Sequence, residues 1–89
     1  MLLVDLRLPA DFADEHIAGS INMPIAVLQA ELSRQGIQRV PIYLICSNGS
    51  LAYKAADILA SLGFERLVVM AGGLLAWRVF GFPLVGRKH

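Results

Sequence analysis

Short strand-like runs alternate with helix-like stripes along the whole 89-residue chain, and this alternation is what most constrains its fold. The clearest strand is 40–45 (VPIYLI), a β-branched and aromatic run typical of a strand covered on both faces. A helical stripe follows, in which Leu51, Ala55 and Leu59 share one face and Gly63 marks the end. Such alternation predicts an α/β fold with three layers, α/β/α, around a small, mostly parallel central sheet.

Six further elements complete the expected alternation. They are strands at 2–6, 19–24 (very short) and 67–70, and helices at 10–15 (about one turn), 25–35 and 74–80. In sheets of this kind ligands bind beyond the carboxyl ends of the strands. Cys46 directly follows the best strand and therefore stands at the expected position of a site.

Length and composition narrow the class of protein. The chain is 56% hydrophobic and only 17% charged, which excludes a disordered chain, and its length predicts one domain, 1–89. A formal net charge of +1 argues against a nucleic-acid partner. The longest apolar stretch, 67–77, is too short for a bilayer span, and Asp5 interrupts any signal peptide. We expect a cytoplasmic protein without a membrane partner.

Cys46 is the only cysteine, so an internal disulfide and a thiolate-based zinc site are excluded. His16 and His89 are the only imidazoles, and a metal site would have to recruit carboxylates from far along the chain. We expect no metal. Cys46 is then either buried filler at the end of a strand or a reactive thiol.

The residues after Cys46 favour the reactive thiol. Small side chains at Ser47, Gly49 and Ser50 allow successive backbone N–H groups to turn inward as an anion-binding nest. The following helix directs the positive end of its dipole to the same space, which favours the ionised sulfur. The pattern predicts a nucleophile whose negatively charged adduct is held by backbone amides.

Three separated motifs carry a resemblance to a known family. Asp5-Leu6-Arg7, Asp11-Phe12 and 16–24 (HIAGSINMP) resemble the opening signature of the rhodanese family, D-x-R followed by E-F-x-x-G-H-I-x-G-A-x-N-x-P. The segments 72–77 (GGLLAW) and 81–83 (GFP) resemble its closing signature. Cys46 stands where the family carries its active-site cysteine, and the match runs from 4 to 85.

The resemblance implies a sulfurtransferase in which Cys46 cycles through a persulfide without a cofactor. The donor would be thiosulfate, polysulfide or a protein persulfide, and the acceptor would be cyanide or a thiol, including one on a protein. Six loop residues would bind the substrate: Ser47, Asn48, Gly49, Ser50, Leu51 and Ala52. Asp5 and Arg7 would form an ion pair that supports the active loop, and His16 would be a packed imidazole that ties its turn to its neighbours.

The chain also departs from the family pattern. Active members often carry C-R-x-G-x-R, whereas 46–51 (CSNGSL) has no charge, and Leu51 replaces a common arginine. We expect weak affinity for thiosulfate. Lys54, the basic residue nearest to this segment in the sequence, either compensates in part or is an ordinary surface lysine. The alternative is a catalytically silent module that binds or regulates a protein partner. A cysteine phosphatase, which uses C-x5-R, is disfavoured because residue 52 is alanine.

The resemblance leaves open whether the chain contains the whole family domain. Domains of this family usually place a strand and a short helix before the D-x-R strand, and here that strand starts almost at Met1. We expect either a minimal form of the fold or a piece of a longer protein.

Overall fold

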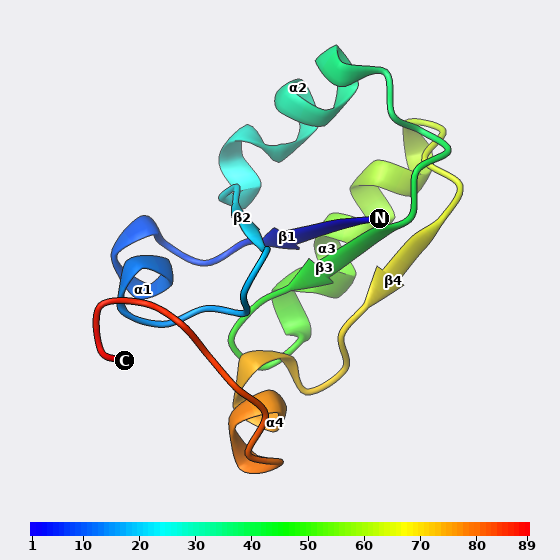
Figure 1. Cartoon of the computed structure of the whole chain (residues 1–89). Coiled ribbons are helices and arrows are strands. Elements are labelled where there is room, and N and C mark those ends of the chain that lie inside the picture. Colours follow the sequence, from blue (N-terminus) through cyan, green and yellow to red (C-terminus); the bar gives the residue numbers. More distant parts are fainter.

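The computed structural model describes residues 1–89 and contains a four-stranded, fully parallel sheet and four helices (Figure 1). The strands are β1 (Leu2–Asp5), β2 (Ile21–Asn22), β3 (Ile42–Ile45) and β4 (Leu67–Val69), in the spatial order β2-β1-β3-β4. The helices are α1 (Pro9–Asp14), α2 (Ile25–Gln35), α3 (Ser50–Ser61) and α4 (Gly73–Val79). The predicted α/β fold is confirmed.

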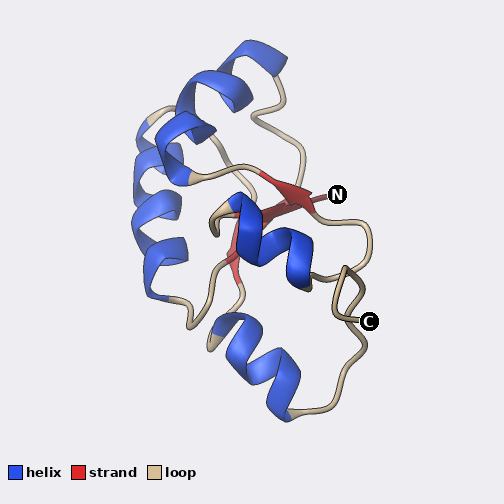
Figure 2. Cartoon of the chain, turned by 90° about the vertical axis from the view of Figure 1, so that its left-hand side faces the viewer, coloured by secondary structure: helices blue, strands red, loops and turns tan.

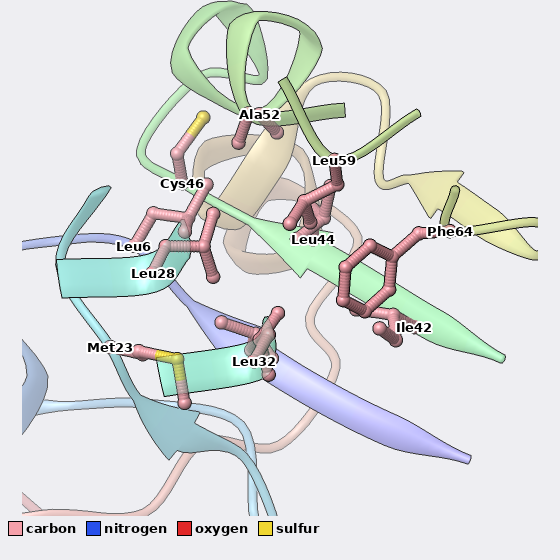
Figure 3. Packing of buried hydrophobic residues seen from close by; sticks show 12 residues of the cluster. Leu6, Met23, Leu28, Leu32, Ile42, Leu44, Cys46, Ala52, Leu59 and Phe64 are labelled. Carbon is pink, nitrogen blue, oxygen red and sulfur yellow. The ribbon is translucent and has the colours of Figure 1, made fainter. Parts of the chain in front are cut away.

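Helices α2 and α3 cover one face of the sheet and bury the larger part of the core (Figures 2 and 3). Alternate strand residues such as Val4 and Leu44 point to this face and pack against Leu28 and Leu32 of α2 and Leu59 of α3. All five side chains are almost completely buried. Burial of each such side chain stabilises the fold by about 1.5–3 kcal/mol, so this layer holds the sheet together.

The opposite face carries a smaller apolar cluster. Ile45 of β3 packs there with Ile17, which precedes β2, and Leu74 of α4, and Trp77 packs against them from the same helix. The indole N–H of Trp77 donates to the carbonyl of Pro83 at 2.9 Å, which ties the chain after α4 to the helix. None of the four helices is long and apolar enough to cross a lipid bilayer.

The strand expected at 40–45 begins later, at Ile42. The N–H of Val40 donates to the carbonyl of Ile37 in a turn, and Pro41 has no N–H to give to a sheet. On the side of β3 that faces β4, the first hydrogen bond is therefore the one from Ile42 N–H to the carbonyl of Arg66. The apolar pattern predicted the strand, while the turn and the proline set its start.

The strand register brings three chain segments to one edge of the sheet. Asp5, the last residue of β1, lies opposite both Ile45 of β3 and Asn22 of β2. The residues that follow each strand, including Leu6 and Cys46, therefore emerge side by side at the carboxyl edge. This is the edge at which the sequence predicted a site.

The last residues of the chain return to α1 (Figure 1). Val85 forms an antiparallel bridge with His16, and the N–H of Arg87 donates to the carbonyl of Ala13 at 2.8 Å. Two acids at the end of α1 pair with bases from the C-terminal third. Asp14 pairs with Arg87 and Lys88, and Glu15 pairs with Arg78 and His89.

We predict that this C-terminal contact loosens in acid. The side-chain hydrogen bond from Arg87 holds the pKa of Asp14 below its ordinary value of 3.8. Because the pKa is depressed in the folded chain, the ion pair contributes stability above pH 3.8, and this contribution is lost as the pH falls through the lowered pKa. Hydrogen exchange should show the Arg87 amide losing protection in that range.

The matched control is the buried ladder of β3. The amide of Leu44 should keep its protection over the same pH range, and Asp14→Asn should show the acid behaviour of Arg87 already at neutral pH. Equal loss of protection at both amides would show global unfolding and contradict the prediction.

Candidate active site

Cys46 begins the loop between β3 and α3, and its side chain is only 2% exposed. The backbone N–H of Gly49 donates to Sγ of Cys46 at 3.0 Å. Gly49 has φ +98°, a left-handed conformation that turns the chain back on the sulfur and that non-glycine residues rarely adopt. The loop therefore holds a backbone donor directly on the thiol.

The start of α4 fixes the orientation of this loop. The N–H groups of Leu74 and Leu75 donate to the carbonyls of Cys46 and Ser47 at 2.8 and 2.9 Å. These two donors would otherwise be unpaired, because the first N–H groups of a helix have no partner within it. In a planar trans peptide the C=O and the following N–H point in opposite directions, so the Ser47 and Asn48 N–H groups face away from α4.

The close contact between the Cys46 loop and the start of α4 requires a residue without a side chain at position 73. A Cβ built on Gly73 would lie 2.4 Å from the carbonyl oxygen of Cys46 and 2.8 Å from the nitrogen of Gly49. Gly73 also has φ +57°. Gly73 therefore serves the close approach of two backbones behind the Cys46 loop, whereas a side chain at Gly72 would meet Ala76 of α4 itself.

The start of α3 supplies further N–H groups. The N-cap residue Gly49 has no side chain to cap this helix, and the N–H groups of Leu51 and Ala52 precede the first backbone bond, from Tyr53 N–H to the carbonyl of Gly49. The N–H and hydroxyl of Ser50 both donate to Oδ1 of Asn48, at 3.1 and 2.8 Å. The nest expected from the sequence is thus formed in part: Gly49 faces the sulfur, while the amide of Ser50 has a different partner.

A pocket of about 460 Å³ opens beside Cys46. Its walls come from the Cys46 loop, from residues 6–8 after β1, from Asp11 of α1 and from 24–26 at the start of α2. Leu6, Leu51 and Ile25 make much of the wall apolar. The sulfur therefore borders both the apolar core and an open hollow large enough for a small sulfur compound.

Most of the predicted substrate-binding residues line this pocket, namely Ser47, Asn48, Ser50 and Leu51. Gly49 lies buried behind the sulfur, where it acts through its N–H. Ala52 does not line the pocket: its methyl group is completely buried in the core, because position 52 lies on the inward stripe of α3. Ala52 therefore presents only its backbone N–H at the start of α3.

Sequence reasoning missed the opposite wall of the pocket. Leu8, Pro24 and Ala26 lie far from Cys46 in the chain and carry no chemically distinctive group. One signal existed: residues that follow β1 and β2 must share an edge with residues that follow β3 once the sheet is parallel. That signal locates the segments, but it does not say which side chains line the hollow.

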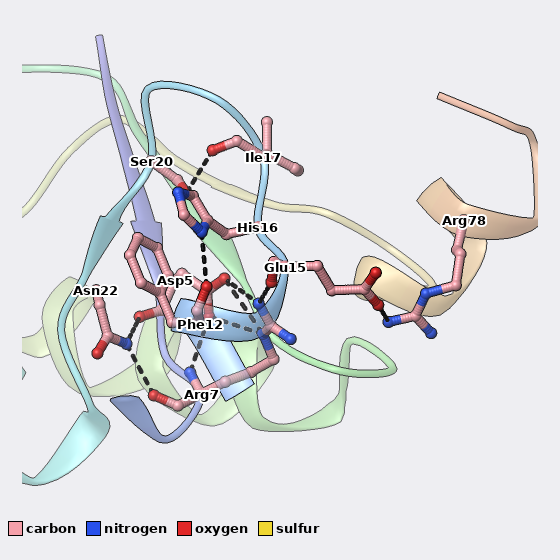
Figure 4. A network of polar contacts seen from close by, with 9 residues as sticks. All are labelled: Asp5, Arg7, Phe12, Glu15, His16, Ile17, Ser20, Asn22 and Arg78. Carbon is pink, nitrogen blue, oxygen red and sulfur yellow. Dashed lines mark hydrogen bonds and ion pairs between the residues drawn. The ribbon is translucent and has the colours of Figure 1, made fainter. Parts of the chain in front are cut away.

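Asp5 and Arg7 form a buried ion pair, as expected (Figure 4). Nη2 of Arg7 lies 2.9 Å from Oδ2 of Asp5, and Nε donates to the same carboxylate. Nη2 also donates to the carbonyl of Glu15 at 2.6 Å, and the amide of Asn22 donates to the carbonyl of Arg7. Loss of one partner from such a buried pair costs about 3–5 kcal/mol.

The hydrogen bonds of this pair show which segments it joins directly. None of its hydrogen bonds reaches the 46–51 loop, and the pair instead joins the end of β1 to the turn after α1 and to β2. It therefore shapes the wall of the pocket opposite the loop. Arg7 also lines the pocket itself.

His16 has the packed position predicted for it. Its ring stacks on Phe12 with centroids 3.8 Å apart, and Nδ1 lies 2.6 Å from the carbonyl of Phe12. His16 does not line the pocket of Cys46. Glu15, where the family motif has glycine, has the extended φ of −160°, so the turn does not require glycine.

Comparison with known proteins agrees with this architecture. The family model of the rhodanese-like domain matches residues 1–79. A sulfurtransferase from Allochromatium vinosum is 31% identical over 88 residues, which are 99% of this chain and 81% of that protein. An uncharacterized protein from Synechocystis is 33% identical over 89 residues, and the chain spans about half of its length (49%).

A solved structure gives the same result for the fold. The solution structure of a rhodanese-like domain from Anabaena matches 99% of this chain with a TM-score of 0.90 at 31% sequence identity. The match covers 67% of that chain. The present chain belongs to the rhodanese-like domain family.

We predict that Gly73→Ala disrupts the active loop. The new methyl group would collide with the backbone at Cys46 and Gly49, so the loop must move and the bond from Leu74 N–H to Cys46 must break. The free energy of unfolding should fall by more than about 3 kcal/mol in chemical denaturation, since backbone collision adds to the left-handed strain.

Gly63→Ala is the matched control. Gly63 has φ +89° but nothing within 4 Å of a built Cβ, so it reports the strain alone, about 1–2 kcal/mol. Equal losses in the two variants would contradict the close approach at Gly73.

Proposed function

We propose that this chain is a sulfurtransferase in which Cys46 carries the transferred sulfur as a persulfide. The single observation that carries the proposal is the N–H of Gly49 directed at Sγ of Cys46, at the edge of an open pocket. A buried filler cysteine has no need of either feature. Membership of a family with members named sulfurtransferases supports the same assignment.

The first half-reaction loads the cysteine. The thiolate of Cys46 attacks the outer sulfur of the donor, a new bond forms from Sγ to that sulfur, and the donor's S–S bond breaks. The electron pair of that bond leaves with the donor remnant, which is sulfite for thiosulfate and a thiolate for a persulfide. The N–H of Gly49 and the open N–H groups at the start of α3 favour the anionic sulfur before and after the transfer.

The second half-reaction passes the sulfur on. Cyanide, a small thiol or a thiol on a partner protein attacks the outer sulfur of the persulfide, and the Cys46 thiolate leaves. No redox cofactor takes part, because one S–S bond is exchanged for another bond to sulfur. We also propose a cytoplasmic setting, because the proposed reaction needs the Cys46 thiol to stay reduced and that compartment keeps thiols reduced.

The loop composition supports a preference among donors. Thiosulfate is a dianion, and the segment 46–51 offers it no basic side chain. A persulfide, a polysulfide or a persulfide on a protein depends less on such a side chain, and the largely apolar wall suits an alkyl group beside the sulfur.

We predict that the wild-type chain gains one sulfur atom after treatment with polysulfide and that Cys46→Ser gains none, measured by intact-protein mass spectrometry. Cys46 is the only cysteine, so any sulfur gained must be on it. Ser61→Ala, on the exposed end of α3, is the control and should load like the wild type.

Two results would contradict the proposal. Sulfur gained by Cys46→Ser would remove Cys46 from the reaction. A folded wild-type chain that gains no sulfur from thiosulfate, polysulfide or small persulfides would favour the silent binding module instead.

A further inference from the structure

The charges around the Cys46 pocket are unequal. Arg7 and Asp11 are the only charged side chains that line it. The charge of Arg7 is balanced by Asp5, whose carboxylate receives hydrogen bonds from Nε and Nη2. Asp11 is exposed and forms no ion pair. The ion pair of Asp5 and Arg7 is neutral as a whole, so Asp11 leaves one net negative charge at the wall of the pocket.

Nothing else in the pocket offsets this carboxylate. The loop segment 46–51 is uncharged, and Lys54, the nearest base in the sequence, does not line the pocket. The remaining bases that form ion pairs do so elsewhere, for example Arg34 with Glu31 and Arg78 with Glu15. An approaching anion meets attraction from backbone N–H groups near the sulfur and repulsion from Asp11 at the wall.

We propose that Asp11 is a specificity-determining residue that selects cationic or uncharged sulfur donors over anionic ones. The substrate class that fits is a small alkyl persulfide with an ammonium group, whose alkyl part contacts the apolar wall while its charge lies near Asp11. This inference rests on the proposed function, since it concerns the donor from which Cys46 takes sulfur.

The transfer from such a donor balances without a further reactant. The Cys46 thiolate attacks the outer sulfur of the donor R–S–SH, a bond forms from Sγ to that sulfur, and the donor's S–S bond breaks. The products are the Cys46 persulfide, which keeps the proton on its outer sulfur, and the thiolate of R. The ammonium group of R takes no part in bond making and acts only through its charge.

A matched pair of donors isolates the effect of charge. Cysteamine persulfide and mercaptopropionate persulfide have the same two-carbon chain and end in an ammonium and a carboxylate group, respectively. The quantity measured is the ratio of their second-order rate constants for sulfur loading of Cys46, followed by mass spectrometry in low salt. The wild-type chain should favour the cationic donor.

Asp11→Asn should lower this ratio about fivefold, as expected from Coulomb's law for charges roughly 8 Å apart in water. Asp57→Asn on α3 is the control, because Asp57 is exposed, forms no ion pair and does not line the pocket. It changes the net charge by the same amount and should leave the ratio unchanged. Raising the salt concentration should reduce the ratio in the wild type and the control, and far less in Asp11→Asn.

The outcomes separate this inference from the proposed function. If both donors load Cys46 and Asp11→Asn keeps the wild-type ratio, Asp11 does not select the donor, while the sulfurtransferase assignment stands. If the two aspartate variants lower the ratio equally, overall charge is responsible and the inference fails. If neither donor loads the folded wild type, the proposed function fails as well.

Discussion

The site depends on the contact between two backbones, the loop after β3 and the start of α4. The N–H groups of Leu74 and Leu75 donate hydrogen bonds to the carbonyls of Cys46 and Ser47. The absence of a side chain at Gly73 allows the two segments to touch. With its carbonyls held on one side, the loop presents N–H groups on the other. One contact therefore satisfies the open end of a helix and orients the loop whose Gly49 N–H donates to the sulfur.

The fold supplies the remaining wall through the register of its sheet. Parallel strands β1, β2 and β3 end at one edge, so Leu6, Pro24 and Cys46 meet although they are far apart in the chain. The buried pair of Asp5 and Arg7 then holds the turn after α1 in place. The resulting pocket combines backbone donors near the sulfur with apolar side chains and one carboxylate further out.

Local chemistry explains what was predictable from the sequence. Apolar periodicity identified the strands and long helices, because burial imposes it directly, and the position after a strand singled out Cys46. The inward face of Ala52 and the pairing of Asp14 with Arg87 were not predictable. Each depends on the exact orientation of a helix or on residues that meet only after folding.

The most direct test of the account is an NMR pH titration of the backbone amides around Cys46. Ionisation of the thiol should shift the Gly49 amide proton more than any other, because that N–H donates to the sulfur, and the Ser50 amide should shift less because it donates to Asn48. In Cys46→Ser the large Gly49 shift should be absent. A Gly49 amide that does not respond to the sulfur in the wild type would contradict the account.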